Sequence, residues 1–210
     1  MDITASKLRN AGTTEMVINV HHFADQIIEY VNTHDLGMDI HISDESDELL
    51  DTGGGLKKAL RLFSANDASP ILIHNVDILS NADLTYFYES NQDVDVALMV
   101  SARTTQRYLL FDDTMRMVGW TNIATGEVRS PYKDLDISKC QKYAFSGIHV
   151  VNPSIATLMD KYPAKFPIMN FYIANCDKIN IRGVVNHELR LLDVGKQDTL
   201  TAAEEFLQTL

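Results

Sequence analysis

The chain has 210 residues, 45% of them hydrophobic and 22% charged, which is typical of a globular domain rather than of a disordered segment. Its net charge of −11 argues against a broad nucleic-acid-binding surface, which needs clustered basic residues, but leaves room for a small anionic substrate whose charge a cation offsets. No apolar run approaches the roughly 20 residues that a membrane span requires, and residues 1–12 carry no signal-peptide core. Cys140 and Cys176 form no CxxC pair and fit buried thiols in a reducing compartment. We therefore expect a cytoplasmic protein that binds neither membrane nor nucleic acid.

The first half of the chain alternates between short β-branched runs and amphipathic segments. A helix is predicted over residues 3–10, with Gly12 as its C-terminal cap. Strands are predicted at residues 15–20, 38–42, 71–74 and 94–101. Helices are predicted at residues 22–31 and 84–89, and from about residue 54. This alternation is typical of a parallel sheet with helices on both faces.

The pattern changes between residues 108 and 151, where short strands follow one another without a helix. They are predicted at residues 108–111, 117–120 and 144–151, separated by the turn signals Asp112-Asp113 and Thr125-Gly126. A small antiparallel insertion beside the sheet is therefore expected. Helices at 153–161 and 167–174, strands near 179–184 and 189–194, and a helix at 199–210 complete the chain. The predicted fold class is α/β: a Rossmann-like, mixed, mainly parallel sheet with helices on both faces, in a single domain over residues 1–210.

A glycine-rich turn, Asp-Thr-Gly-Gly-Gly at residues 51–55, lies between a predicted strand and a helix that Thr52 is expected to cap. Three glycines let the backbone approach a ligand closely, and a helix N-terminus offers free N–H groups. A purely structural turn explains the same pattern. The turn is neither a G-x-G-x-x-G sequence nor a P-loop, which disfavours a dinucleotide-dependent oxidoreductase.

Two apolar runs, at residues 70–77 and 190–195, each bring an aspartate to the end of a strand. A carboxylate at the C-terminal end of a buried strand lies where open α/β sheets bind their ligands. Asp77 and Asp193 could converge there and hold one Mg²⁺ against a nucleoside phosphate, because Mg²⁺ prefers a few carboxylates, water and phosphate oxygens. Two ordinary turn aspartates are the alternative.

Five segments in a fixed order resemble the sugar-phosphate nucleotidyltransferases, in particular the branch of N-acetylmuramate-1-phosphate uridylyltransferase and mannose-1-phosphate guanylyltransferase relatives. They are residues 17–23, 51–56, 74–77, 143–148 and 192–195. The resemblance implies the nucleotide-diphospho-sugar transferase fold. It also implies that Asp77 and Asp193 are the catalytic, metal-binding aspartates. It further implies a nucleotide site and a sugar site, formed respectively by Thr52, Gly53, Gly54, Gly55 and Asn75, and by Phe145, Ser146 and Gly147.

The resemblance also has departures. Leu191 stands where relatives have a tryptophan, and no Glu-Lys-Pro motif is recognisable near Thr125-Gly-Glu127. The GxGTR loop and the Pro-Lys motif are not found either, so a domain without its first strand and phosphate-binding loop is expected. Losing those phosphate-binding groups would impair catalysis.

The implied reaction joins an NTP to a sugar-1-phosphate, giving an NDP-sugar and pyrophosphate with Mg²⁺ as cofactor. The alternative is a non-catalytic sugar-nucleotide-binding or assembly module, and a homo-oligomer would cover apolar surface left by the absent strand. Arg103 and Arg107 are candidates for secondary phosphate contacts, with a solvated or structural role as the alternative.

Overall fold

The computed structural model describes residues 1–63, 69–195 and 200–208. The chain divides into two compact units, each formed by two segments. Unit 1 comprises Met1–Ser69 and Pro153–Tyr172, and unit 2 comprises Pro70–Asn152 and Ile173–Leu210. The single domain over residues 1–210 stays a prediction.

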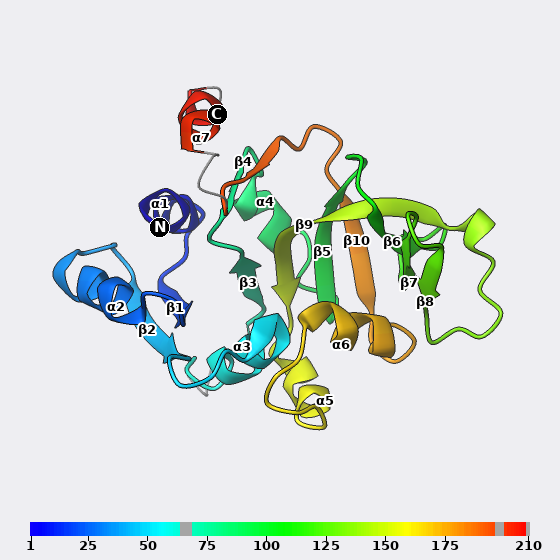
Figure 1. Cartoon of the computed structure of the whole chain (residues 1–210), viewed down its shortest axis with the longest axis horizontal. Coiled ribbons are helices and arrows are strands. Elements are labelled where there is room, and N and C mark those ends of the chain that lie inside the picture. The colour runs from blue at the N-terminus through cyan, green and yellow to red at the C-terminus, as the bar shows by residue number, and fades with distance from the viewer. Residues whose placement is uncertain (64–68, 196–199, 209–210) are drawn as a thin grey trace. The chain divides into compact units, whose positions relative to one another are not determined.

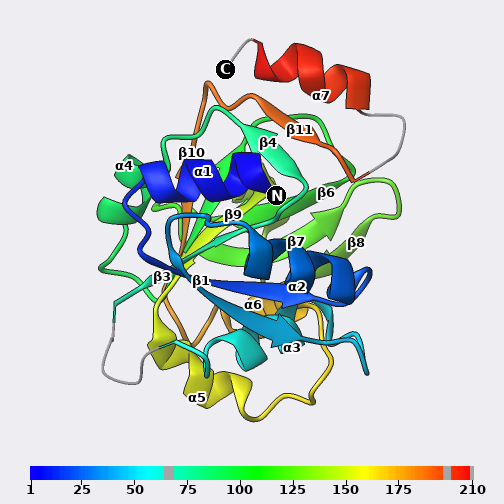
Figure 2. The ribbon, with the colours of Figure 1, turned by 90° about the vertical axis from the view of Figure 1, so that its left-hand side faces the viewer.

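Unit 1 is built around a short β-α-β element. Strands β1 (Glu15–Val20) and β2 (Asp39–Asp44) pair in parallel, in register from Glu15↔Asp39 to Val20↔Asp44, and α2 (Ala24–Thr33) connects them (Figure 2). A helical crossover is what a parallel pair requires. The other elements of the unit are α1 (Asp2–Asn10), α3 (Asp51–Ala59), η2 (Pro153–Ile155) and α5 (Ala156–Met159). Gly12 follows the end of α1 with a φ of +92°, as predicted for a C-terminal glycine.

Unit 2 contains a seven-stranded sheet arranged around β9 (Gln141–Val151), which pairs with three strands. Figure 1 shows β9 between β3 (Ile71–His74) and β5 (Val96–Ser101). The strand order is β10-β5-β9-β6-β7-β8, and β3 pairs with β9 outside this path. The other strands of this sheet are β6 (Arg107–Phe111), β7 (Met117–Asn122), β8 (Glu127–Arg129) and β10 (Ile181–Val185).

The remaining described elements of the chain are short. Strands β4 (Ile78–Ser80) and β11 (Leu191–Asp193) form a separate antiparallel pair. The helices are α4 (Leu84–Glu89), η1 (Ile137–Lys139), α6 (Ile168–Asn175), which spans the division between the units, and α7 (Leu200–Leu207). The predicted C-terminal helix extends to residues 199, 209 and 210, which lie outside the described residues.

The mixed α/β class is confirmed, but parallel pairing in the described residues is confined to β1–β2 and β5–β10. The reason is β9, which runs antiparallel to β3, β5 and β6. Strands β6, β7 and β8 form the predicted small antiparallel insertion, and they continue the sheet from β9. An apolar run has the same sequence signature in either direction, so the sequence did not reveal the orientation of β9.

The core of unit 2 is centred on β5, whose residues Val96, Ala97, Leu98 and Val100 are fully buried. The pairings with β10 and β9 cover its two edges, and its residues are buried on both faces, which explains its nearly continuous apolar sequence. Across the described residues, no helix is both long and apolar enough to cross a membrane.

One titratable side chain, His149, lies inside this core opposite Leu98. It is 4% exposed, and burial is the main cause that lowers the pKa of its imidazole to about 3, with a smaller contribution from His74. The folded protein therefore holds His149 neutral at every pH from neutral down to about 4.

This burial predicts a loss of stability in acid. The ordinary pKa of histidine is 6.5, so between pH 6.5 and 3 the unfolded chain binds a proton that folded His149 does not. The free energy of unfolding should fall by up to ~1.4 kcal/mol per pH unit across this range. Urea denaturation at pH 7.5, 6 and 5 measures it, and H149F should have a shallower slope than the exposed-site control H34Q. A ring ¹⁵N chemical shift of His149 that titrates near pH 6.5 would contradict the expectation.

Candidate functional site

Two aspartates far apart in the sequence lie together in unit 2. Asp193 is the last residue of β11 and pairs with Ile78, the residue after Asp77. The amide of Val194 donates a hydrogen bond to the carbonyl oxygen of Asp77 at 2.8 Å. Backbone pairing therefore fixes Asp77 and Asp193 beside each other. We call these two residues the acidic pair.

The carboxylates of the acidic pair face the same glycine. A Cβ added at Gly195 would lie 3.1 Å from Asp77 Oδ2 and 3.2 Å from Asp193 Oδ1. The amide of Gly195 also donates to Asp193 Oδ1 at 2.9 Å, which fixes the orientation of that carboxylate. Asp77 is half-buried and Asp193 is exposed, so the pair is open to solvent and to ligands.

The predicted sugar residues lie in an irregular part of β9 next to Asn75. The register of β5 against β9 shifts between Leu98, which pairs with His149, and Val100, which pairs with Phe145, and this leaves Ser146, Gly147 and Ile148 between the paired residues of β9. We call Phe145, Ser146 and Gly147 the β9 bulge. Ser146 Oγ donates to the Met99 carbonyl at 2.7 Å, and Gly147 has a φ of +80°, which favours glycine.

Asn75 connects the β9 bulge to the acidic pair. Its amide donates to the Gly147 carbonyl at 3.1 Å, and its Nδ2 would lie 3.0 Å from a Cβ at Gly147. Its own carbonyl accepts from the amide of Ile78, which directly follows Asp77, at 3.2 Å. Unit 2 thus brings together six of the predicted site residues, namely Asn75, Asp77, Phe145, Ser146, Gly147 and Asp193.

The remaining predicted site residues lie in unit 1, where the structure corrects the expected turn. Helix α3 begins at Asp51, so Thr52 and the three glycines lie inside its first two turns. Leu50 is the N-cap, and Thr52 does not cap the helix; its Oγ1 accepts from the amide of Ile168 at 3.0 Å. The predicted cap was wrong because the helix begins three residues before the predicted start, with Asp51 as its first residue at a φ of +61°.

The amides of this glycine helix already have a partner in the chain. Gly53 and Gly54 both donate to the carbonyl oxygen of Phe166, at 2.8 and 3.2 Å. A Cβ at Gly53 would collide with the Phe166 ring, and a Cβ at Gly54 would collide with the Ala164 carbonyl oxygen. The glycines therefore let residues 164–166 approach the helix backbone, which is a structural reason for the motif. Its nucleotide-binding role stays a prediction.

Sequence reasoning missed a buried carboxylate in unit 1. Glu45 is 5% exposed, and its Oε1 accepts from Asn19 Nδ2 at 2.7 Å while its Oε2 accepts from the amide of Leu50 at 3.0 Å. Asn19 Nδ2 also lies 3.1 Å from the Gly55 carbonyl. This network fixes the N-terminus of α3, where a negative charge is favourable. A single glutamate after a strand carries no sequence signal that would have revealed it.

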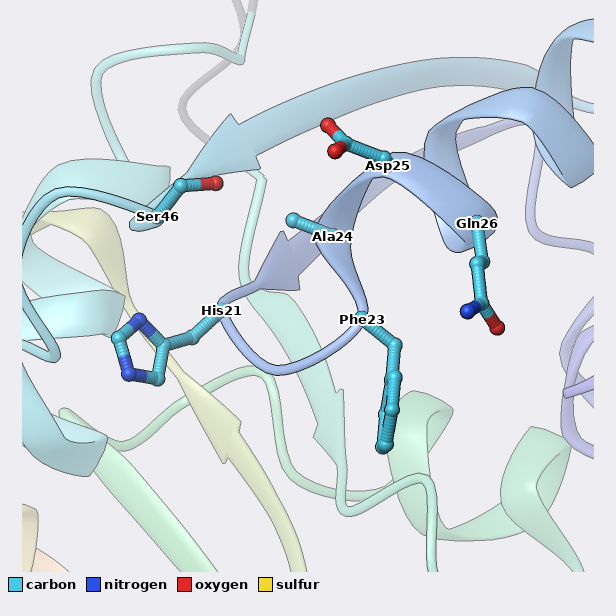
Figure 3. Close-up of a pocket in the computed structure, with 6 residues that line it drawn as sticks. All are labelled: His21, Phe23, Ala24, Asp25, Gln26 and Ser46. Carbon is cyan, nitrogen blue, oxygen red and sulfur yellow. The ribbon is translucent and has the colours of Figure 1, made fainter.

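A pocket of about 290 Å³ opens beside the first turn of α2 (Figure 3). It is lined by His21, Phe23, Ala24, Asp25, Gln26 and Ser46. His21 Nδ1 lies 2.6 Å from the Glu45 carbonyl, so this histidine has a structural partner at the edge of the pocket. Phe23 is 75% exposed with a φ of 56°.

No group of three or more His, Cys, Asp or Glu side chains that could hold a metal ion occurs in the described part of the chain. The acidic pair alone would supply two carboxylates. Such a set is poor for a structural ion but suits Mg²⁺, which retains waters and binds substrate phosphate oxygens. The magnesium site stays a prediction.

Comparison with known proteins identifies enzymes of sugar-nucleotide chemistry. No protein-family model matches the chain. It is 29% identical over 164 residues to N-acetylmuramate alpha-1-phosphate uridylyltransferase of Caulobacter vibrioides, covering 74% of this chain and 63% of that protein. The chain thus spans less than two thirds of the length of this curated relative.

Solved structures of the same class share the fold. HddC from Yersinia pseudotuberculosis superposes with a TM-score of 0.73 at 19% identity, covering 98% of this chain and 84% of HddC. The inositol-1-phosphate CTP transferase from T. maritima gives a TM-score of 0.70 at 12% identity, with coverages of 98% and 80%. The resemblance to sugar-phosphate nucleotidyltransferases is confirmed. The fold is the Rossmann-like nucleotide-diphospho-sugar transferase fold.

The glycine helix yields a stability prediction. Replacing a helical glycine by alanine normally stabilises a protein by up to ~1 kcal/mol. G54A should instead lower the free energy of unfolding by ~1–3 kcal/mol, because its Cβ would overlap the Ala164 carbonyl oxygen. Chemical denaturation measures the change. G12A is the control, since nothing lies within 4 Å of its Cβ and only its positive φ opposes the substitution. Stabilisation by G54A would show that the helix does not pack against residues 164–166 in this way.

Proposed function

We propose that the chain transfers a nucleotidyl group from an NTP to a sugar-1-phosphate, giving an NDP-sugar and pyrophosphate. The observation that carries the proposal is the acidic pair, whose two carboxylates face Gly195 within reach of one ion. Asp77 Oδ2 and Asp193 Oδ1 lie 3.1 and 3.2 Å from the position of a Cβ at Gly195, so the distance between the two oxygens is at most twice as large. Two carboxylates held this near to each other would suit Mg²⁺, which also takes water and substrate phosphate oxygens as ligands.

In this proposal Asp77 and Asp193 hold Mg²⁺, which supplies neutralisation of the charge on the nucleotide phosphates. Asn75 and the residues of the glycine helix, Thr52, Gly53, Gly54 and Gly55, bind the nucleotide. The β9 bulge, with Phe145, Ser146 and Gly147, binds the sugar. The sugar phosphate oxygen then attacks the α-phosphorus in line, and pyrophosphate leaves. Positioning and charge neutralisation provide most of the catalysis in such reactions.

The relatives support this assignment without fixing the substrates. The curated relative is named for N-acetylmuramate 1-phosphate and uridylyl transfer, and a structure of HddC is complexed with GMP-PN. The latter superposes with a TM-score of 0.71 at 20% identity, covering 95% of this chain and 82% of HddC. The uridylyl group in the name of the curated relative and the guanine nucleotide in the HddC complex contain different nucleobases. We therefore propose an NTP and a sugar-1-phosphate as substrates without naming the nucleobase or the sugar. A cytoplasmic location and a homo-oligomer stay predictions.

The non-catalytic alternative, a sugar-nucleotide-binding or assembly module, is favoured by the occupied amides of α3. Gly53 and Gly54 donate to Phe166 and leave those N–H groups unavailable to a phosphate. A non-catalytic module and an impaired enzyme would both bind the ligands and release little pyrophosphate. Measuring pyrophosphate release and ligand binding on the same sample distinguishes either of them from a fully active enzyme.

The assignment of the acidic pair predicts the effect of removing either charge. D77N and D193N should each lower Mg²⁺-dependent pyrophosphate release, or Mg²⁺–NTP affinity where turnover is weak, by ~100-fold or more. Asparagine keeps the shape of either side chain, and at position 193 its Oδ1 can still accept the hydrogen bond from the Gly195 amide, so the melting temperature should change little.

D134N is the matched control, because Asp134 is an exposed aspartate of the same unit. It should behave like the wild-type protein in both assays. Wild-type activity and wild-type Mg²⁺–NTP affinity in both D77N and D193N would refute the assignment of the acidic pair.

A further inference from the structure

Arg103 is an exposed cation held at the β9 bulge. It follows β5 by two residues, and its Nη2 donates to the Phe145 carbonyl at 2.9 Å. Among the ion pairs of the described residues, none includes Arg103. A guanidinium has five N–H donors in a rigid fork, so one bond to a carbonyl leaves several donors and the full charge available to a ligand.

The position of this guanidinium is fixed by the strand pairing. Val100 pairs with Phe145 and Ser101 with Ala144, so the chain leaves β5 directly beside the bulge. Ser146 Oγ holds the same segment to the Met99 carbonyl. Because Phe145 lies in the sheet and its carbonyl already accepts a hydrogen bond from Arg103, ordering the arginine on a ligand loses less conformational entropy than ordering an unbonded side chain would.

Local charge makes such a cation useful. The chain carries a net charge of −11, and the acidic pair adds two carboxylates to the same unit. A sugar-1-phosphate is an anion, and a cation already placed beside the bulge would offset the repulsion. Arg107, four residues later, is also exposed but begins β6 and has no bond to the bulge that the structure describes.

We propose that Arg103 binds the phosphate of the sugar-1-phosphate while the β9 bulge binds the sugar. This inference rests on the proposed function, because it requires that the bulge is the sugar site. Guanidinium suits the phosphate group because two of its parallel N–H donors can match two phosphate oxygens. Arg103 is then a substrate-binding residue that determines recognition of the phosphorylated sugar.

The test is calorimetric binding with the full chain. Glucose 1-phosphate, mannose 1-phosphate and N-acetylmuramate 1-phosphate are titrated into the wild-type protein, R103A and the matched control R107A, and UTP and GTP are titrated with Mg²⁺. R103A should bind the preferred sugar-1-phosphate ~10- to 100-fold more weakly, the range for a charge-assisted contact. R107A should stay within about twofold of wild type, and Mg²⁺–NTP affinity should be unchanged in both variants.

Ionic strength distinguishes phosphate binding from a structural role. Salt should weaken the binding of the sugar-1-phosphate to wild type, and this dependence should be smaller in R103A. An R103A protein that equals R107A in affinity, or that loses affinity with an unchanged salt dependence, would overturn the inference for Arg103 alone. A loss seen only with the carboxylate-bearing N-acetylmuramate 1-phosphate would also overturn it. A wild-type protein that binds none of the sugar-1-phosphates and neither Mg²⁺–NTP would overturn the proposed function itself.

Discussion

The site depends on one backbone contact, the hydrogen bond from the Val194 amide to the Asp77 carbonyl. Together with the β4–β11 pairing, it places Asp193 beside Asp77 although 115 residues separate them in the chain. Two carboxylates held this close repel each other, since the energy of like charges rises steeply at short distance. Backbone hydrogen bonds hold the pair in place independently of side-chain charge. A structure that keeps such a repulsion at a solvent-open position is suited to binding a cation.

Local sequence patterns located most elements of the fold because local physical chemistry sets their ends. Strand β3 follows Pro70, and α4 begins after Asp83, whose carboxylate accepts from the Tyr86 amide at 2.9 Å. Long-range pairing was not visible in the same way. The three residues of β4 are too few to show an alternation, and only β11 makes them a strand. The antiparallel direction of β9 likewise depends on its partners and not on its own residues.

In the candidate site, too, local sequence patterns could be interpreted and long-range contacts could not. The sequence drew attention to Asp77 and Asp193 because each carboxylate ends an apolar run, where burial without a ligand or partner would be unfavourable. The structure places the two residues together, and their catalytic role stays a prediction. The start and the cap of the glycine helix were predicted wrongly, and its nucleotide-binding role stays a prediction, because glycines that admit a ligand and glycines that admit Phe166 have the same sequence. The difference between Arg103 and Arg107 was also invisible, since it comes from a long-range hydrogen bond between the Arg103 side chain and the Phe145 carbonyl.

Gly195 shows how backbone chemistry completes the site. Its amide orients the Asp193 carboxylate, so the residue contributes a hydrogen bond without a side chain. A Cβ at this position would contact an oxygen of each member of the acidic pair, at 3.1 and 3.2 Å. A methyl group there would occupy the space that an ion and its waters need and would bring apolar surface against two charges. The proposed cation site therefore depends on the missing side chain at Gly195 as well as on the two carboxylates.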